Sequence, residues 1–342
     1  MNLRFAIFLA AFASLAAPAW AVDKVTKTTG ESVTADVVRV TATEVTVKRG
    51  ASEETIPVDT IASIAYGDEP PQLKLIRAAV DGGNYEGALA PLAKLTDSRA
   101  RAEVKQDIDF YRVYATAKLA LLGAGDVRES GKQLRAFVDA NPTTYHYLPA
   151  SETLGDLFAA VGAFEPAMQS YEKLAKSPFP NYQVRGNIAL GRALVAQRKL
   201  PEALDRFAEA ERVADAAAGK LDDLKTAAIL GKASCMAETG EHDAAIALVE
   251  TLLAGLDAEA SDLHAQAYVT LGNCFRKKPD SAKQALLAFL HVDVLYSSNA
   301  AAHAEALWNL GVLFNEIGQP DRAAQVTQML KQSYGGSVWA QR

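Results

Sequence analysis

The order of hydrophobic and polar positions changes character near residue 70. From residue 22 to residue 66, short segments rich in valine and threonine alternate apolar and polar side chains; Val38 and Val40 lie on one segment, Val45 and Val47 on another. An alternation with period two is typical of β-strands. Turn-forming glycines separate several of these segments, as expected for hairpins. The pattern predicts four or five short strands that form a small, barrel-like all-β domain over residues 22–68.

Helical periodicity replaces the strand pattern after the segment GDEPPQ, residues 67–72. Pro70 and Pro71 cannot continue a hydrogen-bonded ladder, and proline suits the first positions of a helix. From there alanine and leucine dominate, and apolar residues recur at helical spacing. Residues 69–342 are therefore predicted to form a helical repeat domain.

A Leu-Gly pair recurs five times in this helical part, with glycines 36 to 41 residues apart. The glycines are Gly155, Gly191, Gly231, Gly272 and Gly311. A glycine inside a helix costs about 1 kcal/mol relative to alanine, so its repetition needs a reason in the packing. We expect each glycine at the crossing of two helices, where the absence of a side chain allows close approach, with the preceding leucine buried.

Further residues recur at fixed distances from these glycines. In the segment LGDLFAAVGAFEPAMQSYEKL, which starts at residue 154, they are Phe158, Ala167 and Tyr171. This order of Leu-Gly, aromatic, alanine and aromatic resembles the tetratricopeptide repeat, a helix–turn–helix unit of about 34 residues. The resemblance implies a mainly α fold, an α-solenoid. Together with two less regular hairpins before the first Leu-Gly pair, we count about seven helical hairpins up to residue 334.

The first 21 residues have the layout of a secretory signal peptide. Arg4 precedes an apolar run, residues 5–17, and Ala19-Trp20-Ala21 has the small-x-small form of a cleavage site. The run is shorter than the roughly 20 residues of a membrane span, and no later stretch qualifies, although an uncleaved N-terminal anchor remains an alternative. We predict an exported protein, periplasmic in the first place and secreted in the second. The β-rich segment resembles the SH3-like and Sm-like small barrels near the N-terminus of some exported bacterial proteins.

Composition and motifs argue against several functions. The formal net charge of −6 does not favour nucleic-acid binding, which usually needs a basic domain. The five histidines lack the spacing of a zinc site, and no phosphate loop, nucleophile elbow or Cys-His pair at motif spacing is found. Cys235 and Cys274 fall about 200° apart in the repeat register, so packed free thiols are preferred over a disulfide. We predict no catalytic residue, no metal and no cofactor.

The family resemblance also implies a concave groove, lined by the first helix of each hairpin, that such arrays use for binding. Positions carried over from the repeat glycines select polar residues, with a basic bias in the middle repeats. The residues predicted for a peptide-binding groove are Arg185, Arg192, Lys225, Lys232, Asn273, Arg276, Lys277 and Trp308. The cations could hold an acidic peptide or a carboxylate, and Trp308 could serve as an apolar anchor. A merely solvated face is the alternative.

These observations predict a non-enzymatic, exported scaffold that binds a protein or peptide partner in the cell envelope. A second hypothesis is an enzyme, or a carbohydrate- or small-molecule-binding protein, with a site at the junction of the β-domain and the repeats, where Tyr66, Asp68 and Glu69 lie. A third is a structural protein whose terminal hairpins stack end to end. The sequence leaves the partner's identity and the oligomeric state open.

Overall fold

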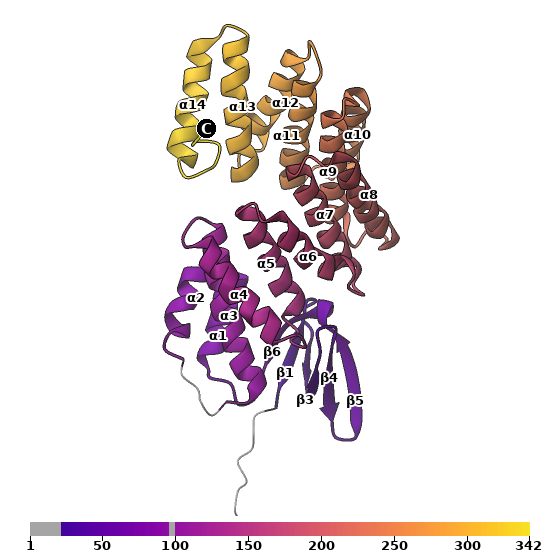
Figure 1. Ribbon diagram of the computed structural model, residues 1–342, viewed down its shortest axis with the longest axis vertical. Helices are drawn as coiled ribbons and strands as arrows, with labels where there is room; N and C mark the ends of the chain where they lie inside the picture. Colours follow the sequence, from indigo (N-terminus) through magenta and orange to yellow (C-terminus); the bar gives the residue numbers. More distant parts are fainter. Residues whose placement is uncertain (1–21, 96–99) are drawn as a thin grey trace, which may run out of the picture. The chain divides into compact units, whose positions relative to one another are not determined.

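The computed structural model describes residues 22–95 and 100–342 of the 342-residue chain, so the predicted signal peptide lies outside the described residues. The described residues form six β-strands followed by fourteen α-helices (Figure 1). A small β region ahead of a mainly α helical array is therefore confirmed. Contacts divide the chain into two units. The first comprises the described residues up to Ala115 with Thr143–Tyr145, and the second comprises Thr116–Pro142 with His146–Arg342.

The β region consists of two three-stranded antiparallel sheets with the strand orders β2-β1-β6 and β3-β4-β5. The strands are β1 (Lys24–Lys27), β2 (Ser32–Thr34), β3 (Asp36–Val40), β4 (Glu44–Arg49), β5 (Ser52–Pro57) and β6 (Ile61–Ala65). The structure thus has more strands than the four or five expected, because a strand as short as β2 shows no clear alternation. Gly30 and Gly50, with φ of 87° and 61°, form the β1–β2 and β4–β5 turns.

The first unit also holds α1 (Gln72–Asp81), α2 (Tyr85–Leu92) and most of α3 (Ala102–Leu121). A buried guanidinium joins its parts. Arg77 of α1 donates to both carboxylate oxygens of Glu69, at 2.7 and 2.6 Å, and to Asp107 of α3 at 3.1 Å. All three side chains are at most 10% exposed. The paired charges therefore connect the loop after β6 with α1 and α3 inside the core of this unit.

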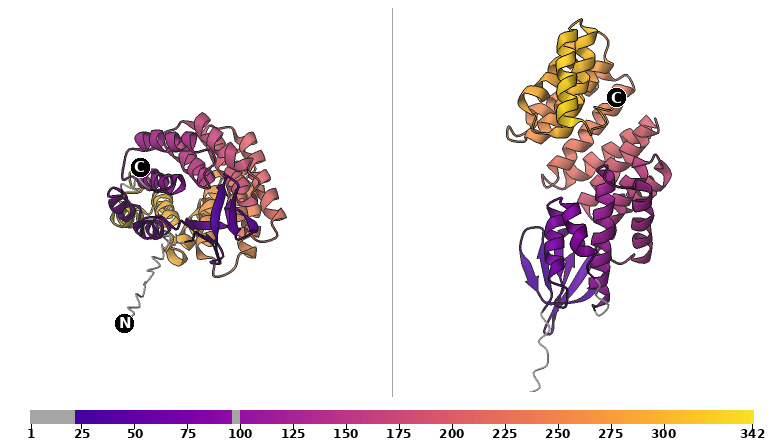
Figure 2. Two further views of the ribbon diagram at one scale, coloured as in Figure 1. Left: turned by 90° about the horizontal axis from the view of Figure 1, so that it is seen from below. Right: turned by 90° about the vertical axis from the view of Figure 1, so that its left-hand side faces the viewer.

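The second unit is an array of antiparallel helices (Figures 1 and 2). Its helices after α3 are α4 (Val127–Ala140), α5 (Tyr147–Ala160), α6 (Phe164–Ala175), α7 (Pro180–Ala196), α8 (Leu200–Ala216), α9 (Asp222–Glu238), α10 (His242–Gly255), α11 (Ser261–Lys277), α12 (Ala282–Leu295), α13 (Ala300–Glu316) and α14 (Pro320–Tyr334). From α4 onward, each helix packs against the next one in sequence. In addition α7, α9, α11 and α13 contact one another in turn, so these first helices of successive hairpins form one layer. Contacts pair α1 with α2, α5 with α6, α7 with α8, α9 with α10, α11 with α12 and α13 with α14, which are six of the seven predicted hairpins.

The repeat glycines lie where an aromatic ring of a second helix presses against a first helix. A Cβ at Gly191 would come within 2.7 Å of the Phe207 ring, and one at Gly231 within 2.4 Å of the same ring. Phe207 of α8 therefore fills the space between α7 and α9 only because both carry glycine there. The close approach is made by a ring rather than by two backbones. At Gly311 the neighbour is the Thr327 hydroxyl, at 3.1 Å, so this position is less crowded.

Both cysteines are free thiols in the packed interior. Cys235 and Cys274 are at most 1% exposed, in agreement with the predicted reduced state. Burial raises the pKa of each thiol to about 11. Separately, no helix among residues 22–95 and 100–342 combines the length and the apolar character required to cross a bilayer.

Candidate functional site

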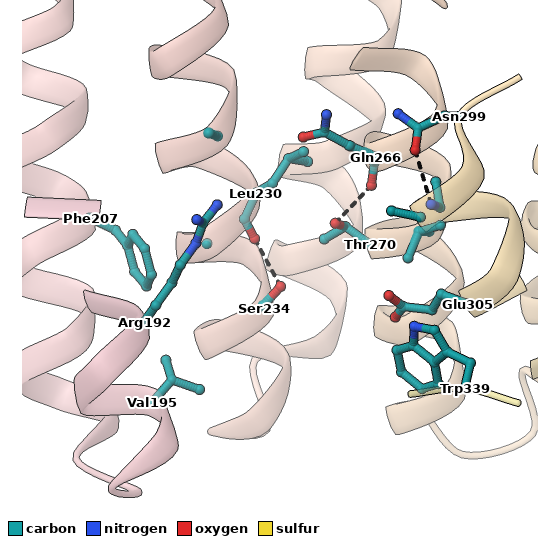
Figure 3. Close-up of a pocket in the computed structure, with 15 residues that line it drawn as sticks. Arg192, Val195, Phe207, Leu230, Ser234, Gln266, Thr270, Asn299, Glu305 and Trp339 are labelled. Atoms are coloured by element: carbon teal, nitrogen blue, oxygen red, sulfur yellow. Dashed lines mark hydrogen bonds between the residues drawn. The ribbon is translucent and has the colours of Figure 1, made fainter. Parts of the chain in front are cut away.

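Two adjoining hollows open on the layer of first helices in the second unit, with volumes of about 550 and 450 Å³. Residues of α7, α9, α11 and α13 line both (Figure 3 shows the larger). The hollows share four lining residues: Val195, Ser234, Glu305 and Trp339. They therefore form one continuous surface depression, called the groove below.

Five of the eight residues predicted for a peptide site line this groove. Arg192 lines the larger hollow, and Asn273, Arg276, Lys277 and Trp308 line the smaller one. The structure does not bring the other three residues to either hollow. These are Arg185, Lys225 and Lys232. The repeats are longer than 34 residues, so positions carried over by offset do not all reach the same face.

Ion pairs neutralise most of the predicted basic character. Four of the predicted cations form an ion pair with a carboxylate. In each pair the cation and the carboxylate belong to two different helices. The pairs are Arg185 with Glu152, Lys225 with Asp215, Lys232 with Glu211, and Lys277 with Glu238. Of these four compensated cations only Lys277 lines the groove, and its partner Glu238 lines the groove with it.

Arg192 differs from those four cations. It is exposed at one end of the groove, and its guanidinium makes no ion pair with any residue in the described ranges. Close by, the hydroxyls of Ser234 and Thr270 donate back to their own helices, to Leu230 O at 2.9 Å and Gln266 O at 3.0 Å (Figure 3). Those hydroxyl protons are engaged, whereas Arg192 keeps free donors for a carboxylate or a carbonyl group.

Glu305 of α13 lies where the two hollows meet. Its Oε1 accepts a hydrogen bond from the Asn273 side-chain amide at 2.9 Å. Burial raises the pKa of the Glu305 carboxyl above its ordinary range, while the Asn273 hydrogen bond and the Arg342 charge act in the opposite direction. The centre of the groove thus holds a poorly solvated acid that favours a nearby cation or donor.

The smaller hollow contains a cluster of indole rings and guanidinium groups. The Arg276 guanidinium lies 5.6 Å from the centroid of Trp308 and donates to Asn309 Oδ1. The ring of Trp339 lies 5.3 Å from that of Trp308. Arg342 lies 5.3 Å from the Trp308 ring and 4.3 Å from the Trp339 ring. Such distances are typical of aromatic and cation–π contacts.

The repeat pattern does not predict Trp339 and Arg342 as groove residues, because they follow the last helix and lie outside the repeat register. In the structure Trp339 packs on the apolar cluster of Ala304, Leu307 and Leu330 and lines both hollows. The available signal was compositional, since a tryptophan and an arginine stand within four residues of each other in an otherwise small and polar segment.

The residues named for the alternative junction site take part in internal pairing instead. The Arg101 guanidinium contacts the carboxylates of Asp23 and Asp68 and lies 4.3 Å from the Tyr66 ring centroid. Glu69 accepts from the Tyr66 backbone N–H at 3.0 Å and from Arg77. These groups stabilise the first unit. Among residues 22–95 and 100–342, no three His, Cys, Asp or Glu side chains are grouped so as to hold a metal ion.

Comparisons with known proteins agree with the helical hairpins. Family models described as tetratricopeptide repeat match residues 188–264 and 305–337. These two ranges of the chain match tetratricopeptide repeats. The matched ranges include α9 and parts of α7 and α13, three of the helices that line the groove. No curated protein sequence matches the chain.

Solved structures share the fold at low sequence identity. The apo form of RapI has a TM-score of 0.59 at 11% identity, covering 78% of this chain and 98% of RapI. A Rap protein complexed with Competence and Sporulation Factor has a TM-score of 0.56 at 14% identity, covering 78% of this chain and 76% of that one. A tetratricopeptide repeat protein from Parabacteroides merdae has a TM-score of 0.57 at 12% identity, with coverages of 77% and 91%. At these identities the likeness is one of fold alone.

Proposed function

We propose that this protein is a non-enzymatic tetratricopeptide-repeat scaffold that binds an extended segment of a protein partner in its groove. One observation carries the proposal: the groove is continuous across the first helices of four successive hairpins. An extended peptide needs such an elongated surface, whereas a small substrate needs a more enclosed pocket.

The chemistry along the groove supports a peptide ligand. One end offers the exposed donors of Arg192, the middle offers the Asn273–Glu305 pair, and the other end offers the Trp308 indole. Val195 and Leu230 contribute apolar surface to the larger hollow. Separated polar groups can fix the direction and register of a peptide backbone, and an indole can anchor one side chain. Since Glu238 and Glu305 line the groove together with its cations, we do not require the partner to be acidic.

Export is the second part of the proposal, and it rests on the signal-peptide layout of residues 1–21. If it is right, fractionation of producing cells places the protein outside the cytoplasm, and N-terminal sequencing finds Val22 as the first residue. A cytoplasmic chain that retains residues 1–21 would contradict export without affecting the groove.

Affinity capture from an envelope extract tests peptide binding. The bait is the predicted mature chain, residues 22–342, and the groove variant is Arg192→Glu/Arg276→Glu. The control is Lys220→Glu/Lys283→Glu, since both lysines are exposed and neither makes an ion pair within the described residues. We expect a specific protein to bind the wild type and the control but not the groove variant. Equal capture by all three forms would reject the groove as the binding surface.

A further inference from the structure

The end of the groove around Trp308 is already covered by a segment of the same chain. After α14, residues 335–342 turn back so that Trp339 packs on Trp308 and lines both hollows. Arg342 lies close to both indole rings. Trp308 is therefore only partly accessible in this state, although the repeat pattern places it on the binding face.

This internal contact indicates what chemistry the groove end accepts. The Trp308 ring contacts the Trp339 ring, with 5.3 Å between the two centroids. It also contacts the Arg342 guanidinium, which lies 5.3 Å from the Trp308 centroid. The Arg342 charge also acts on the carboxyl group of Glu305 and lowers its pKa. Apart from Arg342, the charged residues that line this hollow are two cations, Arg276 and Lys277, and two carboxylates, Glu238 and Glu305. Their formal charges add up to zero. A cation that approaches the rings meets attraction from the indole faces and from Glu305.

The segment itself is held by few contacts. Its backbone bonds are two short turns, Ser337 N–H to Tyr334 O and Ala340 N–H to Ser337 O. Val338, beside Trp339, is 66% exposed. The two adjacent glycines, Gly335 and Gly336, leave the connection to α14 conformationally free. The attachment thus depends on the side chains of Trp339, Ala340 and Arg342 rather than on backbone pairing with the repeats, and it can be reversed without unfolding α14.

We propose that the groove end around Trp308 binds a peptide segment with an aromatic side chain followed three residues later by a cationic one, and that residues 335–342 occupy this place until a partner displaces them. The inference rests on the proposed function and adds to it the class of ligand and an internal competitor. Because the internal segment is tethered next to its site, its effective concentration is of millimolar order, and a free peptide competes poorly with it.

The test uses a dye-labelled synthetic peptide of residues 335–342, GGSVWAQR, capped at both ends, and the anisotropy of its fluorescence. The proteins are the wild type, the variant Trp339→Ala/Arg342→Ala, and the control Val338→Ala. We expect the peptide to bind the double variant at least about tenfold more tightly than the wild type or the control, because only the double variant has a vacant site. Adding Trp308→Ala to the double variant is expected to abolish binding.

Two altered peptides define the ligand class. A peptide with the Trp339→Ala change is expected not to bind the double variant, whereas one with Trp339→Phe and Arg342→Lys retains measurable binding. Equal affinity for the wild type and the double variant, binding that survives Trp308→Ala, or no binding to either form would each overturn the inference. If the peptide behaves as expected but affinity capture finds no groove-dependent protein, the covered site stands and the protein-scaffold proposal fails.

Discussion

The indole rings of Trp308 and Trp339 lie 5.3 Å apart between centroids at an interplanar angle of 42°. Trp308 belongs to α13, in the layer of first helices, and Trp339 follows the last helix. The contact joins the repeat array to a segment outside the repeats, at the surface where the array would meet a ligand.

The first prediction concerns this contact. In residues 22–342, Trp339→Ala is expected to shift the fluorescence of the remaining tryptophan, Trp308, toward longer wavelength, because that ring loses its cover. The near-ultraviolet circular dichroism of the coupled rings falls as well. The free energy of unfolding decreases by about 1 kcal/mol for the lost aromatic pair, in addition to the loss of the apolar area that Trp339 buries. Val338→Ala serves as the control and leaves the spectrum unchanged.

The second prediction concerns the glycines around Phe207. Gly231→Ala places a methyl carbon 2.4 Å from the Phe207 ring, so the ring or α9 has to move. We expect a net loss of about 1–3 kcal/mol in the free energy of unfolding, despite the higher helix propensity of alanine. Gly255→Ala, at the end of α10, meets no atom within 4 Å and is expected to leave stability unchanged or to raise it. Thermal and urea unfolding compare the two; equal effects would refute the packing role of Gly231.

A third prediction concerns the buried guanidinium of the first unit. Arg77→Leu removes the partner of Glu69 and one partner of Asp107, so we expect a loss of about 3–5 kcal/mol, measured by urea unfolding and by hydrogen exchange of α1 amides. Lys132→Ala breaks the exposed pair with Glu129 and is expected to cost less than about 1 kcal/mol. Similar small losses for both substitutions would show that the buried network does not stabilise this unit.

The fourth prediction is a pH dependence at Glu305. Burial raises the pKa of its carboxyl in the folded chain, so the native state holds this proton more tightly than the unfolded state. Its contribution to stability is therefore complete below the unfolded pKa, about 4.3, and declines as the pH rises through the folded pKa. Glu305→Gln removes this decline, so its melting temperature gains on the wild type as the pH rises above the unfolded pKa of about 4.3. Exposed Glu250→Gln is the control; parallel pH profiles for wild type and Glu305→Gln would contradict the assignment.

The fifth prediction concerns the thiols. With their pKa at about 11 and both side chains buried, Cys235 and Cys274 carry little thiolate at neutral pH and are shielded from reagents. Mass spectrometry after treatment with iodoacetamide should find no modification of the native protein and two modifications after denaturation. Rapid labelling of the native chain, or a mass that indicates a disulfide, would argue against this packing.

The repeat array was predictable because its packing leaves a periodic trace. Each Leu-Gly pair places a buried leucine beside a site that only glycine can occupy, and Leu190 and Leu310 are indeed fully buried. The number of strands was harder to predict, because β2 has only three residues and is too short to show an alternation of apolar and polar positions.

The groove was predictable only in part, for two physical reasons. Whether a cation is available to a ligand depends on whether a carboxylate of another helix already pairs with it. Lys232, for example, pairs with Glu211, which stands 21 residues earlier in the sequence. The covering of Trp308 by Trp339 depends on how a non-repetitive segment folds back, and no periodicity describes that. Arg192 and Arg276 thus line the groove as expected, while the charge of the surface and its internal occupant emerged only from the three-dimensional arrangement.

Photo-crosslinking inside producing cells tests the central claim, binding of a protein segment in the groove, most directly. A photoreactive amino acid replaces Gln266, which is exposed in the larger hollow, and in a matched protein it replaces Gln284, which is exposed on α12 outside both hollows. The account predicts a discrete crosslinked species at Gln266, weakened by Arg192→Glu/Arg276→Glu, and none at Gln284. Crosslinks at Gln284 but not at Gln266, or at both with equal yield, would show that the partner binds elsewhere on the repeats.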